Sequence, residues 1–470
     1  MKIRCFLFTI LILHLMSSCH NSGEQHVRAT PATTPPRKSV HLVTLDPGHF
    51  HAALVQKSMY PDVDSNVYVY APPGPDVKSH LEKVSAYNTR QQNPTRWNEH
   101  VYTGVGYVDQ MISDKKGNTV VLAGNNREKT TYIQRSLEGG FNVLADKPMV
   151  IDNQAFGQLL QAFDTAAAKN LLLYDIMTER YEITCILQRE LCAIPAIYGT
   201  QENGTPQNPG IIASSVHRWY KSVSGSALTR PAWFFDVAQQ GEGIVDVMTH
   251  LVDLVQWGGF PDQTFDYTKD VRVDHARHWT TDLTRSQFMT ITGMVQFPDF
   301  LKKYADPKKD TVLKIYANGE IDYHLKEVCV KTTTAWTYDA PPGAGDTYSS
   351  RMRGTKANLI ILQDAAQHYQ PALYIEPIGS DPAYEQTLTA QFATLQAKYP
   401  GITLQKEGWR WEVIIPDHYK EGHEAHFARV TEKFLGFVKD HNLPAWEVPN
   451  MIAKYYTTIK GLELARKIHQ

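Results

Sequence analysis

The sequence predicts an α/β protein, with a doubly wound parallel sheet first and then an α+β part with an open, mainly antiparallel sheet. Short apolar strands alternate with helical patterns from Val40 to Tyr174, which is typical of a doubly wound sheet. After Thr178 several strands follow one another, with helices grouped before and after them, which favours an open sheet covered on one face. The chain of 470 residues is also too long for one compact core, so two domains are expected.

In the first part, each expected strand is a short apolar run, as in a sheet that helices cover on both faces. Polar or Gly/Pro-containing turns separate these runs from segments with helical periodicity. Strands are expected at Val40–Leu45, Asn66–Tyr70, Val120–Leu122, Phe141–Ala145 and Leu171–Tyr174, and helices from His51 to about Ser58, at Asp76–Ala86, Trp97–Ile112, Glu128–Leu137 and Asn153–Ala168.

The second part begins with an expected helix at about Tyr181–Leu191, followed by a series of strand-like runs and three further helices. No internal repeat and no transmembrane span is recognisable in it. Strands are expected near Ile211–Trp219, Asp270–His275, Ser286–Val295, Val312–Ala317, Leu325–Lys331, Ala357–Leu362 and Ala372–Ile375, and helices at Ala383–Lys398, Gly422–Lys439 and Val448–Ile468.

The most informative segment runs from Thr119 to Val150. It reads as strand, polar turn, helix, Gly-Gly and strand, and ends in Asp146-Lys147-Pro148. A lysine so close to the end of a parallel strand lies at the carboxyl edge of the sheet, where open α/β sheets hold ligands. Because Pro148 stiffens the turn that presents Lys147, the segment indicates a site as well as a fold.

A second segment carries Gly243, Asp246, His250 and Asp253 at spacings of three, four and three residues. If the segment is helical, these residues lie on one face. An isolated Asp-x-x-x-His most often belongs to an ordinary amphipathic helix. Its combination with Asp-Lys-Pro after a strand–helix–strand unit favours a functional role.

With these motifs the chain resembles the glucose–fructose oxidoreductase / inositol dehydrogenase / MocA family. Members commonly carry Glu-Lys-Pro after the fifth strand of a Rossmann domain and an Asp-x-x-x-His helix in the second domain. The resemblance covers about residues 40–355 and the last helix. The matching residues are Asp146-Lys147-Pro148, Asp246-x-x-x-His250, Arg180-Tyr181 and Arg353-Gly354-Thr355, and Leu443–Asn450 further resembles secreted Bacteroidetes members that have their own C-terminal domain.

The resemblance implies NAD(P)-dependent hydride transfer at a secondary hydroxyl of a sugar, glycoside or polyol. His250 would be the base, since a neutral imidazole has a pKa near the working pH. Lys147 would stabilise the developing alkoxide, and Asp246 would bind the substrate or orient His250. Substrate contacts are expected from Arg180, Tyr181, Trp233 and Thr249.

The implied cofactor is NAD or NADP, held tightly. Three features depart from the family pattern: only one glycine remains in the loop after the first strand, no acid follows the second strand, and Asp146 replaces Glu. The choice between NAD and NADP therefore stays open. The expected cofactor contacts are Asp46, Pro47, Gly48, His49, Phe50, His51, Gly124, Asn125, Asn126, Asp146, Lys147 and Pro148.

The pair His49 and His51 raises the question of a metal. No Cys, Asp or Glu cluster near them in the sequence completes a tetrahedral site, so no metal is expected. The net charge of −2 also gives no support to a nucleic-acid partner.

The N-terminus predicts a lipoprotein. Lys2 and Arg4 precede the apolar run Phe6–Met16, as in a secretory signal peptide, and Ser17-Ser18-Cys19 resembles a lipobox. Cleavage before Cys19 and lipidation of its sulfur would anchor the protein to a membrane only through lipid. We expect it in the cell envelope of a Gram-negative bacterium, in the periplasm and on the outer membrane.

The expected domain organisation follows from these segments. Residues 1–18 form the signal peptide, 19–39 a tether, 40–177 the dinucleotide-binding Rossmann domain and 178–470 the substrate domain. An elaboration at about 357–440 and a final helix that packs back on the Rossmann domain complete the chain, and a homodimer is expected from the family.

Two other functions stay open. One is an NAD-dependent glycosidase, in which oxidation at C3 acidifies the C2 proton, elimination breaks the glycosidic bond and the hydride returns; Tyr181 is one candidate base. The other is a carbohydrate-binding lipoprotein without catalysis, which the incomplete glycine fingerprint favours. A secreted enzyme meets little free NAD, so both enzyme hypotheses need a cofactor that is retained and regenerated in the site.

Overall fold

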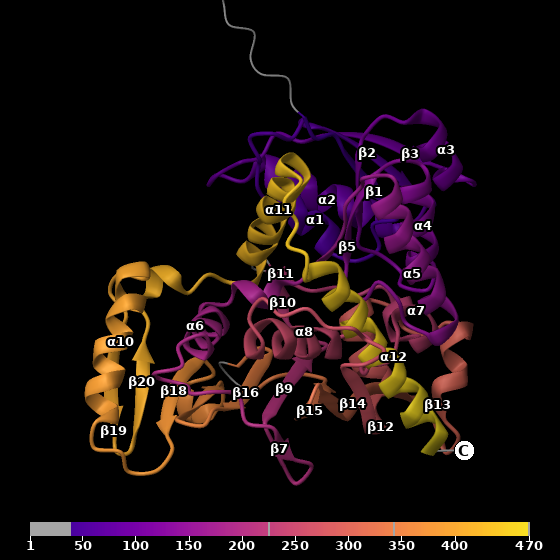
Figure 1. Cartoon of the computed structure of the whole chain (residues 1–470). Helices are drawn as coiled ribbons and strands as arrows, with labels where there is room; N and C mark the ends of the chain where they lie inside the picture. Colours follow the sequence, from indigo (N-terminus) through magenta and orange to yellow (C-terminus); the bar gives the residue numbers. More distant parts are fainter. Residues whose placement is uncertain (1–38, 224–225, 342–343, 469–470) are drawn as a thin grey trace, which may run out of the picture. The chain divides into compact units, whose positions relative to one another are not determined.

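The computed structural model describes residues 39–223, 226–341 and 344–468. Figure 1 shows a parallel sheet formed by the first part of the chain and a larger, mainly antiparallel sheet formed by the rest. The predicted fold class, a Rossmann-type doubly wound sheet followed by an α+β part, is confirmed. The signal peptide, Cys19 and the tether up to residue 38 lie outside the described residues.

The N-terminal sheet has six parallel strands in the order β3-β2-β1-β4-β5-β6. Chain connections change direction between β1 and β4, which is the switch point where such folds bind ligands. The strands are β1 (Leu42–Leu45), β2 (Asn66–Ala71), β3 (Asn98–Thr103), β4 (Thr119–Leu122), β5 (Asn142–Asp146) and β6 (Leu173–Ile176).

Helices follow the strands of this half, and their ends agree with local sequence signals. The Asp152 side chain accepts a hydrogen bond from Ala155 N and starts α5, while Gly139 and Gly140 end α4. The helices are α1 (His51–Val55), α2 (Pro75–Thr89), α3 (Tyr107–Asp114), α4 (Lys129–Glu138) and α5 (Asn153–Ala168).

The second sheet has ten strands in the order β12-β14-β15-β9-β16-β17-β18-β20-β19, with β13 paired to β14. Only β9 and β15 pair in parallel. The strands are β9 (Ile211–Arg218), β12 (Val271–Thr284), β13 (Ala305–Asp306), β14 (Lys309–Leu325), β15 (Val328–Thr337), β16 (Thr347–Arg353), β17 (Ala357–Leu362), β18 (Ala372–Pro377), β19 (Thr403–Glu407) and β20 (Arg410–Ile414).

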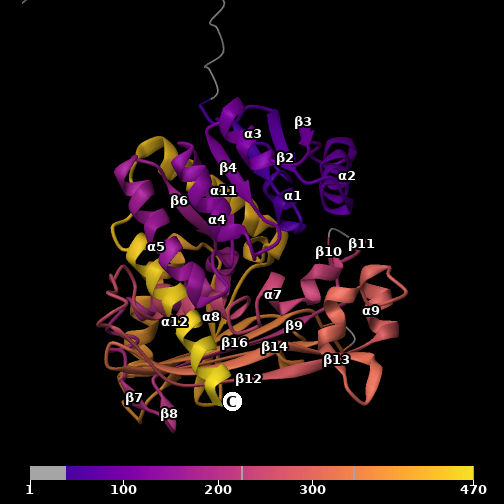
Figure 2. The same ribbon diagram turned by 90° about the vertical axis from the view of Figure 1, so that its right-hand side faces the viewer.

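Helices of the second half connect the two sheets. α6 and α8 pack on the large sheet on the side of the Rossmann half, as Figure 1 shows, and Figure 2 shows α8 in the same place from the side. α11 contacts α1 and β6, and α12 contacts α5, α8 and β12, so both join the halves. The helical segments are η1 (Thr178–Tyr181), α6 (Ile183–Cys192), η2 (Ala232–Phe235), α7 (Val237–Gln240), α8 (Met248–Gly259), α9 (Arg285–Thr292), η3 (Asp299–Tyr304), η4 (Ala365–Gln367), α10 (Tyr384–Lys398), η5 (Asp417–Tyr419), α11 (His423–Asp440) and α12 (Glu447–Ile468).

The predicted helix at Trp97–Ile112 was wrong, because this segment forms β3 and then α3. β3 pairs only with β2, at the edge of the sheet, and most of its residues are exposed or half-buried. An exposed edge strand lacks the apolar run by which a covered strand is recognised. The pairing with β2 decided its structure.

The predicted strand at Ser286–Val295 was also wrong, because α9 occupies it. Thr284 and Gln287 form a reciprocal capping box at its start, and Gly293 ends it with a φ of 74°. Phe288 and Ile291 are both buried, at the spacing of one helical turn. The capping residues therefore indicated a helix more reliably than the β-branched residues of this segment indicated a strand.

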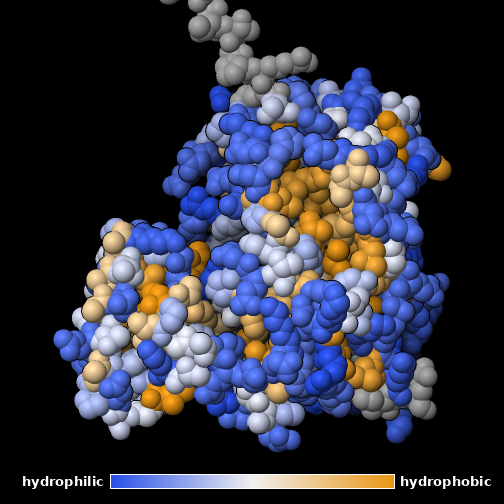
Figure 3. Space-filling view, in the orientation of Figure 1, coloured by the Kyte–Doolittle hydropathy of each residue, from blue (hydrophilic) through white to orange (hydrophobic). Residues whose placement is uncertain are grey.

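The predicted strand at Leu325–Lys331 spans the turn between β14 and β15, where Lys326 has a φ of 53°. Strands β16, β19 and β20 were not predicted. Within the described ranges, none of the helices is long and apolar enough to cross a membrane. On the face that Figure 3 shows, most of the surface is hydrophilic, with apolar residues gathered over the Rossmann half.

Candidate active site

A cavity of about 1040 Å³ lies between the Rossmann half and the large sheet. The loop after β1 and the ends of β4, β5 and β6 form one wall, at the switch point of the parallel sheet. The start of α8, strands β9 and β15 and the start of α11 form the others. The predicted site residues that line it are His49, Phe50, His51, Gly124, Asn126, Asp146, Lys147, Asp246 and His250.

Lys147 and Asp246 form the central contact between the two halves. Lys147 follows β5 directly, and its peptide bond to Pro148 is cis. The Lys147 Nζ donates to Asp246 Oδ1 over 2.6 Å, while Gln240 Nε2 donates to Asp246 Oδ2 over 3.0 Å. Both oxygens of the carboxylate are thus held, and Asp246 fixes the ammonium group at the cavity wall.

Asp246 and His250 do not lie on one helix as predicted, because α8 begins only at Met248. Gly243 lies against the large sheet, where an added Cβ would stand 1.8 Å from the carbonyl oxygen of Ala317. The segment from Gly243 to Val247, directly before α8, forms turns beside this close contact of two backbones. Asp246 therefore sits in a turn and His250 in the first turn of α8, yet both face the cavity.

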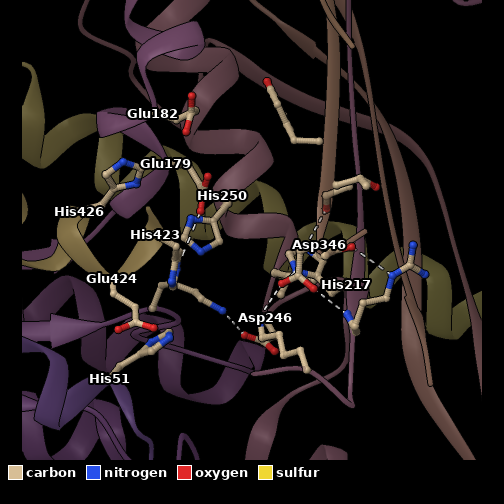
Figure 4. Close-up of a pocket in the computed structure, with 18 of the residues that line it drawn as sticks. His51, Glu179, Glu182, His217, Asp246, His250, Asp346, His423, Glu424 and His426 are labelled. Atoms are coloured by element: carbon tan, nitrogen blue, oxygen red, sulfur yellow. Dashed lines mark hydrogen bonds and ion pairs between the residues drawn. The ribbon is translucent and has the colours of Figure 1, made fainter. Parts of the chain in front are cut away.

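His250 is buried and neutral. Burial, and then the charge of Lys147, hold the pKa of His250 well below its usual value. Its Nδ1 has no hydrogen-bond partner among the described residues. In Figure 4, Asp246 and His250 lie between His51 and His423 on one side and His217 and Asp346 on the other. A neutral imidazole in this position can accept a proton from a bound hydroxyl.

The loop after β1 turns two histidines toward the end of β5. The Nδ1 atoms of His49 and His51 lie 3.3 Å and 2.9 Å from Asp146 Oδ2. The sequence showed no Cys, Asp or Glu cluster that completes a site with these histidines, but the fold brings the carboxylate of Asp146 to them. Asp146 is 95 residues from His51 in the sequence and comes beside it only through the parallel sheet.

The loop after β4 is tied to the second half. Asn125 Nδ2 donates to Gln239 Oε1, and Asn126 Nδ2 donates to the carbonyl oxygen of Gln240, both over 2.7 Å. Gly124 packs on the loop after β1, since an added Cβ would lie 1.9 Å from the carbonyl oxygen of Asp46. Asp46 itself has a left-handed φ of 49°, a conformation that favours glycine.

The two ends of a nicotinamide dinucleotide fit this site differently. The cavity reaches Gly124, Asn126 and Lys147, so the nicotinamide end has room. At the glycine that remains in the loop, an added Cβ would meet Trp233 Cζ2 at 3.0 Å and Asp76 Oδ2 at 3.1 Å. Trp233 Nε1 donates to Asp76 Oδ2 over 2.8 Å, so these two side chains cover the glycine of the loop after β1.

The charge near this loop also disfavours a diphosphate. Burial, followed by the nearby carboxylate of Asp76, raises the pKa of Asp46 to about 6. Two acidic groups thus replace the glycine cradle that usually donates backbone N–H groups. The predicted contacts Asp46, Pro47, Gly48, Asn125 and Pro148 do not line the cavity.

The four predicted substrate residues also lie outside the cavity lining. Arg180 donates to both oxygens of Asp253 over 2.7 Å and to Glu447 over 3.0 Å, in a buried ion-pair network. Trp233 contacts Asp76, and the buried Thr249 donates to the carbonyl oxygen of Asp246. Like Arg180, these two side chains contact other protein groups and not the cavity. Tyr181 is half-buried.

Several cavity residues were not predicted. They come from segments without a shared motif: the turn after β6, the large sheet, the loop before β16 and the start of α11. The only local signal among them is His-x-x-His at the start of α11, which places two imidazoles about one helical turn apart. The unpredicted ionisable residues include Glu179, Glu182, His217, Arg218, Lys221, Arg230, Asp346, His423, Glu424 and His426.

A Rossmann sheet joined to a mainly antiparallel sheet, with a lysine, a carboxylate and a histidine on the wall of one cavity, is the arrangement of an oxidoreductase. Residues 187–466 match the family described as "Putative oxidoreductase C terminal domain". The chain belongs to this oxidoreductase family. None of the curated proteins matches it significantly.

The chain is also similar to solved structures. A "putative oxidoreductase" from Parabacteroides merdae is 53% identical, with a TM-score of 0.90, over 93% of this chain and 99% of that one. A 3-ketoreductase from Actinomadura kijaniata, in complex with NADP and TDP-benzene, is 12% identical with a TM-score of 0.53, over 90% and 96% of the chains. A "putative myo-inositol dehydrogenase" from Sinorhizobium meliloti is 11% identical with a TM-score of 0.53, over 92% and 98%. At this identity, the last two show that the chain shares their fold.

Proposed function

We propose that this protein is an NAD(P)-dependent oxidoreductase that acts on a secondary hydroxyl of a sugar, glycoside or polyol. The observation that carries the proposal is the contact of Lys147 with Asp246, beside His250, on the wall of a large cavity at the switch point. The structural relatives that are named as a 3-ketoreductase in complex with NADP and as a putative myo-inositol dehydrogenase support it.

Oxidation of a secondary alcohol needs a group that accepts the hydroxyl proton and a positive charge beside the alkoxide. Neutral His250 suits the first task, and the Lys147 ammonium suits the second. Asp246 keeps Lys147 in place, and Gln240 keeps Asp246 in place. When bound, the nicotinamide supplies the hydride acceptor, while these side chains position the alcohol and take up its proton.

The far wall of the cavity suits a polyhydroxylated substrate. Lys221 Nζ donates to Asp346 Oδ2 over 2.6 Å, and His217 Nδ1 lies 3.4 Å from the same oxygen. The buried Arg230 and the ring of Trp336 lie nearby. Such alternating donors and acceptors beside an aromatic ring can bind the hydroxyl groups and the apolar face of a sugar.

The cofactor is tested first. Protein purified without added nucleotide is examined for bound NAD(H) or NADP(H) by absorbance and mass spectrometry, and then titrated with both dinucleotides. We expect binding of one of them. Protein that carries no dinucleotide and binds neither on titration contradicts the proposal.

The catalytic residues are tested next, with a panel of glycosides, free sugars and polyols. Replacing Lys147 with Ala, or His250 with Asn, should lower turnover by at least about 100-fold but leave binding of the sugar nearly unchanged. If neither variant loses turnover of a substrate that the wild type oxidises, the assigned roles are wrong. If the wild type binds a sugar but turns over nothing, the carbohydrate-binding alternative is favoured instead.

One observation favours the glycosidase alternative. Glu179 and Glu182 line the cavity, and burial followed by the proximity of Glu182 raises the pKa of Glu179 to about 7. A carboxylic acid that stays protonated near neutral pH can protonate a leaving glycosidic oxygen. Solvent deuterium at C2 of the released sugar, lost in a Glu179→Gln variant, would identify this reaction.

Attachment to the envelope through lipid on Cys19 remains a proposal that rests on the lipobox-like sequence. Expression of a Cys19→Ala variant should move the protein from the membrane fraction to the soluble periplasmic fraction. An unchanged membrane fraction contradicts it. A homodimer likewise remains a prediction.

A further inference from the structure

We propose that His49, His51 and Asp146 form a binding site for a divalent transition-metal ion, with Zn²⁺ as the reference ion. The three side chains each offer one ligand atom, and these atoms all lie within 4.8 Å of one another. Two imidazole nitrogens and one carboxylate oxygen are the ligand set of many catalytic zinc and non-haem iron sites. The inference concerns metal binding alone and does not rest on the proposed function.

The distances suit such a site. Both Nδ1 atoms are directed at one carboxylate oxygen, at 2.9 Å for His51 and 3.3 Å for His49. Ligand atoms about 2.0–2.2 Å from a zinc ion in tetrahedral geometry lie roughly 3.3–3.5 Å apart. Only a small outward movement of the two rings is therefore needed to admit an ion between the three atoms.

The neighbouring ammonium groups are bonded elsewhere. Lys129 Nζ donates to the main-chain carbonyl oxygen of Asp146 over 2.9 Å, and burial lowers its pKa to about 8. Lys147 donates to Asp246. Neither ammonium group therefore forms its hydrogen bond with the carboxylate oxygen that both histidines share.

The site opens on the cavity, because all three residues line it. The ring of His423, from α11, lies 5.8 Å from the ring of His51, on the same wall. A metal with three protein ligands keeps a coordination position for water or for an oxygen of a bound molecule. This cavity supplies the space for that oxygen.

The same residues account for two of the departures from the family pattern. The loop that has lost its glycines carries His49 and His51, and the position where the family has Glu carries Asp146. These two changes lie far apart in the sequence, but the parallel sheet brings them into one cluster. A metal site would explain both departures, because each of them supplies metal ligands.

A second cluster in the described part of the chain, formed by His275, Glu320 and Asp322, is the natural control. Its His275 is exposed, and its carboxylates are already paired: Glu320 with Arg277 and Lys331, each at 3.0 Å. The side chains of Arg277 and Lys331 thus already neutralise the carboxylate that a metal ion would need there. We expect no metal at this cluster.

The experiment uses protein stripped with a chelator and titrated with ZnCl₂ by calorimetry, without dinucleotide or sugar. One Zn²⁺ per chain is expected. Replacing His49 with Ala or His51 with Ala should weaken binding at least about 100-fold, whereas His275→Ala should leave it unchanged. Absence of Zn²⁺ binding by the native protein, or loss of binding in the His275 variant alone, overturns the proposal.

Two further measurements guard against variants that fail to fold. Co²⁺ added to the native protein should give visible absorption typical of a four- or five-coordinate site with nitrogen ligands, and Zn²⁺ should displace it. Asp146→Asn keeps the shape of the side chain and should retain the circular dichroism of the wild type but lose the Co²⁺ spectrum. An Asp146→Asn protein with an unchanged spectrum shows that the ion binds elsewhere.

Discussion

Two buried lysine–aspartate contacts join the halves of this protein, and their surroundings differ. Lys147 meets Asp246 at 2.6 Å on the cavity wall. Lys454, in α12, is 0% exposed and meets Asp175 at 2.7 Å and Asp253 at 2.8 Å. The same chemical pair thus occurs once at an open site and once in a closed interior.

The difference lies in how completely each ammonium group is satisfied. Around Lys454, Asp175 also accepts from Tyr455 Oη, and Asp253 accepts from Arg180, so the network is closed. Lys147 has one carboxylate partner and a cavity beside it. A closed network stabilises the joint between the halves, while an ammonium group beside a cavity can still donate to a substrate oxygen.

The largest effect on stability is expected when the network around Lys454 is broken. Lys454→Met leaves the buried Asp175 without its cation and removes one of the two cations at Asp253, and should lower the free energy of unfolding by about 3–5 kcal/mol. Urea denaturation measures it, with Lys460→Met on the same helix as a control that should change it by less than about 1 kcal/mol. Similar stability of the two variants would mean that the network does not clamp the halves.

The next largest effect is expected when the Lys147–Asp246 contact beside the cavity is broken. Lys147→Ala removes the charge beside the alkoxide and should lower kcat by about 100- to 1000-fold, which corresponds to about 2.7–4 kcal/mol of transition-state stabilisation. The midpoint of thermal unfolding should change far less than in Lys454→Met. Lys116→Ala, on the exposed surface, is the control for kcat, and equal kcat values for the two variants would remove Lys147 from the mechanism.

A smaller effect concerns pH. Since burial lowers the pKa of His250 below its ordinary value of 6.5, the unfolded chain binds this proton more readily than the folded one. Stability from His250 is therefore fully present above pH 6.5 and falls as pH drops toward the lowered value, by up to about 1.4 kcal/mol per pH unit.

Denaturation curves at several pH values measure this slope. A His250→Asn variant should show a shallower loss of stability below pH 6.5 than the wild type. An unchanged slope would show that His250 has the same pKa in the folded and the unfolded chain.

The smallest expected effect sharpens the contrast between the two ends of the cofactor site. Trp233→Ala removes the indole that covers the loop after β1 and should increase dinucleotide affinity several-fold, by about 1 kcal/mol. Trp233→Phe loses only the hydrogen bond to Asp76 and should increase it less. A lower affinity in both variants would mean that Trp233 binds the dinucleotide.

The strands and helices that obey periodicity were predictable from the sequence. Helix α5 and strand β17 have the predicted bounds, because an amphipathic stripe and an N-cap, or an alternating run, are local signals. Strand β3 and helix α9 were not, since pairing at a sheet edge and a capping box overrode the composition of those segments.

Among the site residues, the local motifs led to Lys147, Asp246 and His250, all of which line the cavity. Arg180 also belongs to a motif, but its ion pairs with Asp253 and Glu447 place it in the interior. A motif indicates that a residue is important for the fold or the function. Only the neighbours of the residue in the structure show whether it faces a cavity or forms a buried ion pair.

By itself the sequence determined the fold class, the order of the strands and helices in most segments, and the lysine, aspartate and histidine of the site, because these depend on local periodicity and short motifs. The tertiary structure alone decided that Asp146 meets His49 and His51, that Trp233 covers the loop after β1, and that α11 brings His423 to the cavity. These contacts join residues far apart in the chain, and distances between such residues are set by sheet register and domain packing, which no local pattern encodes.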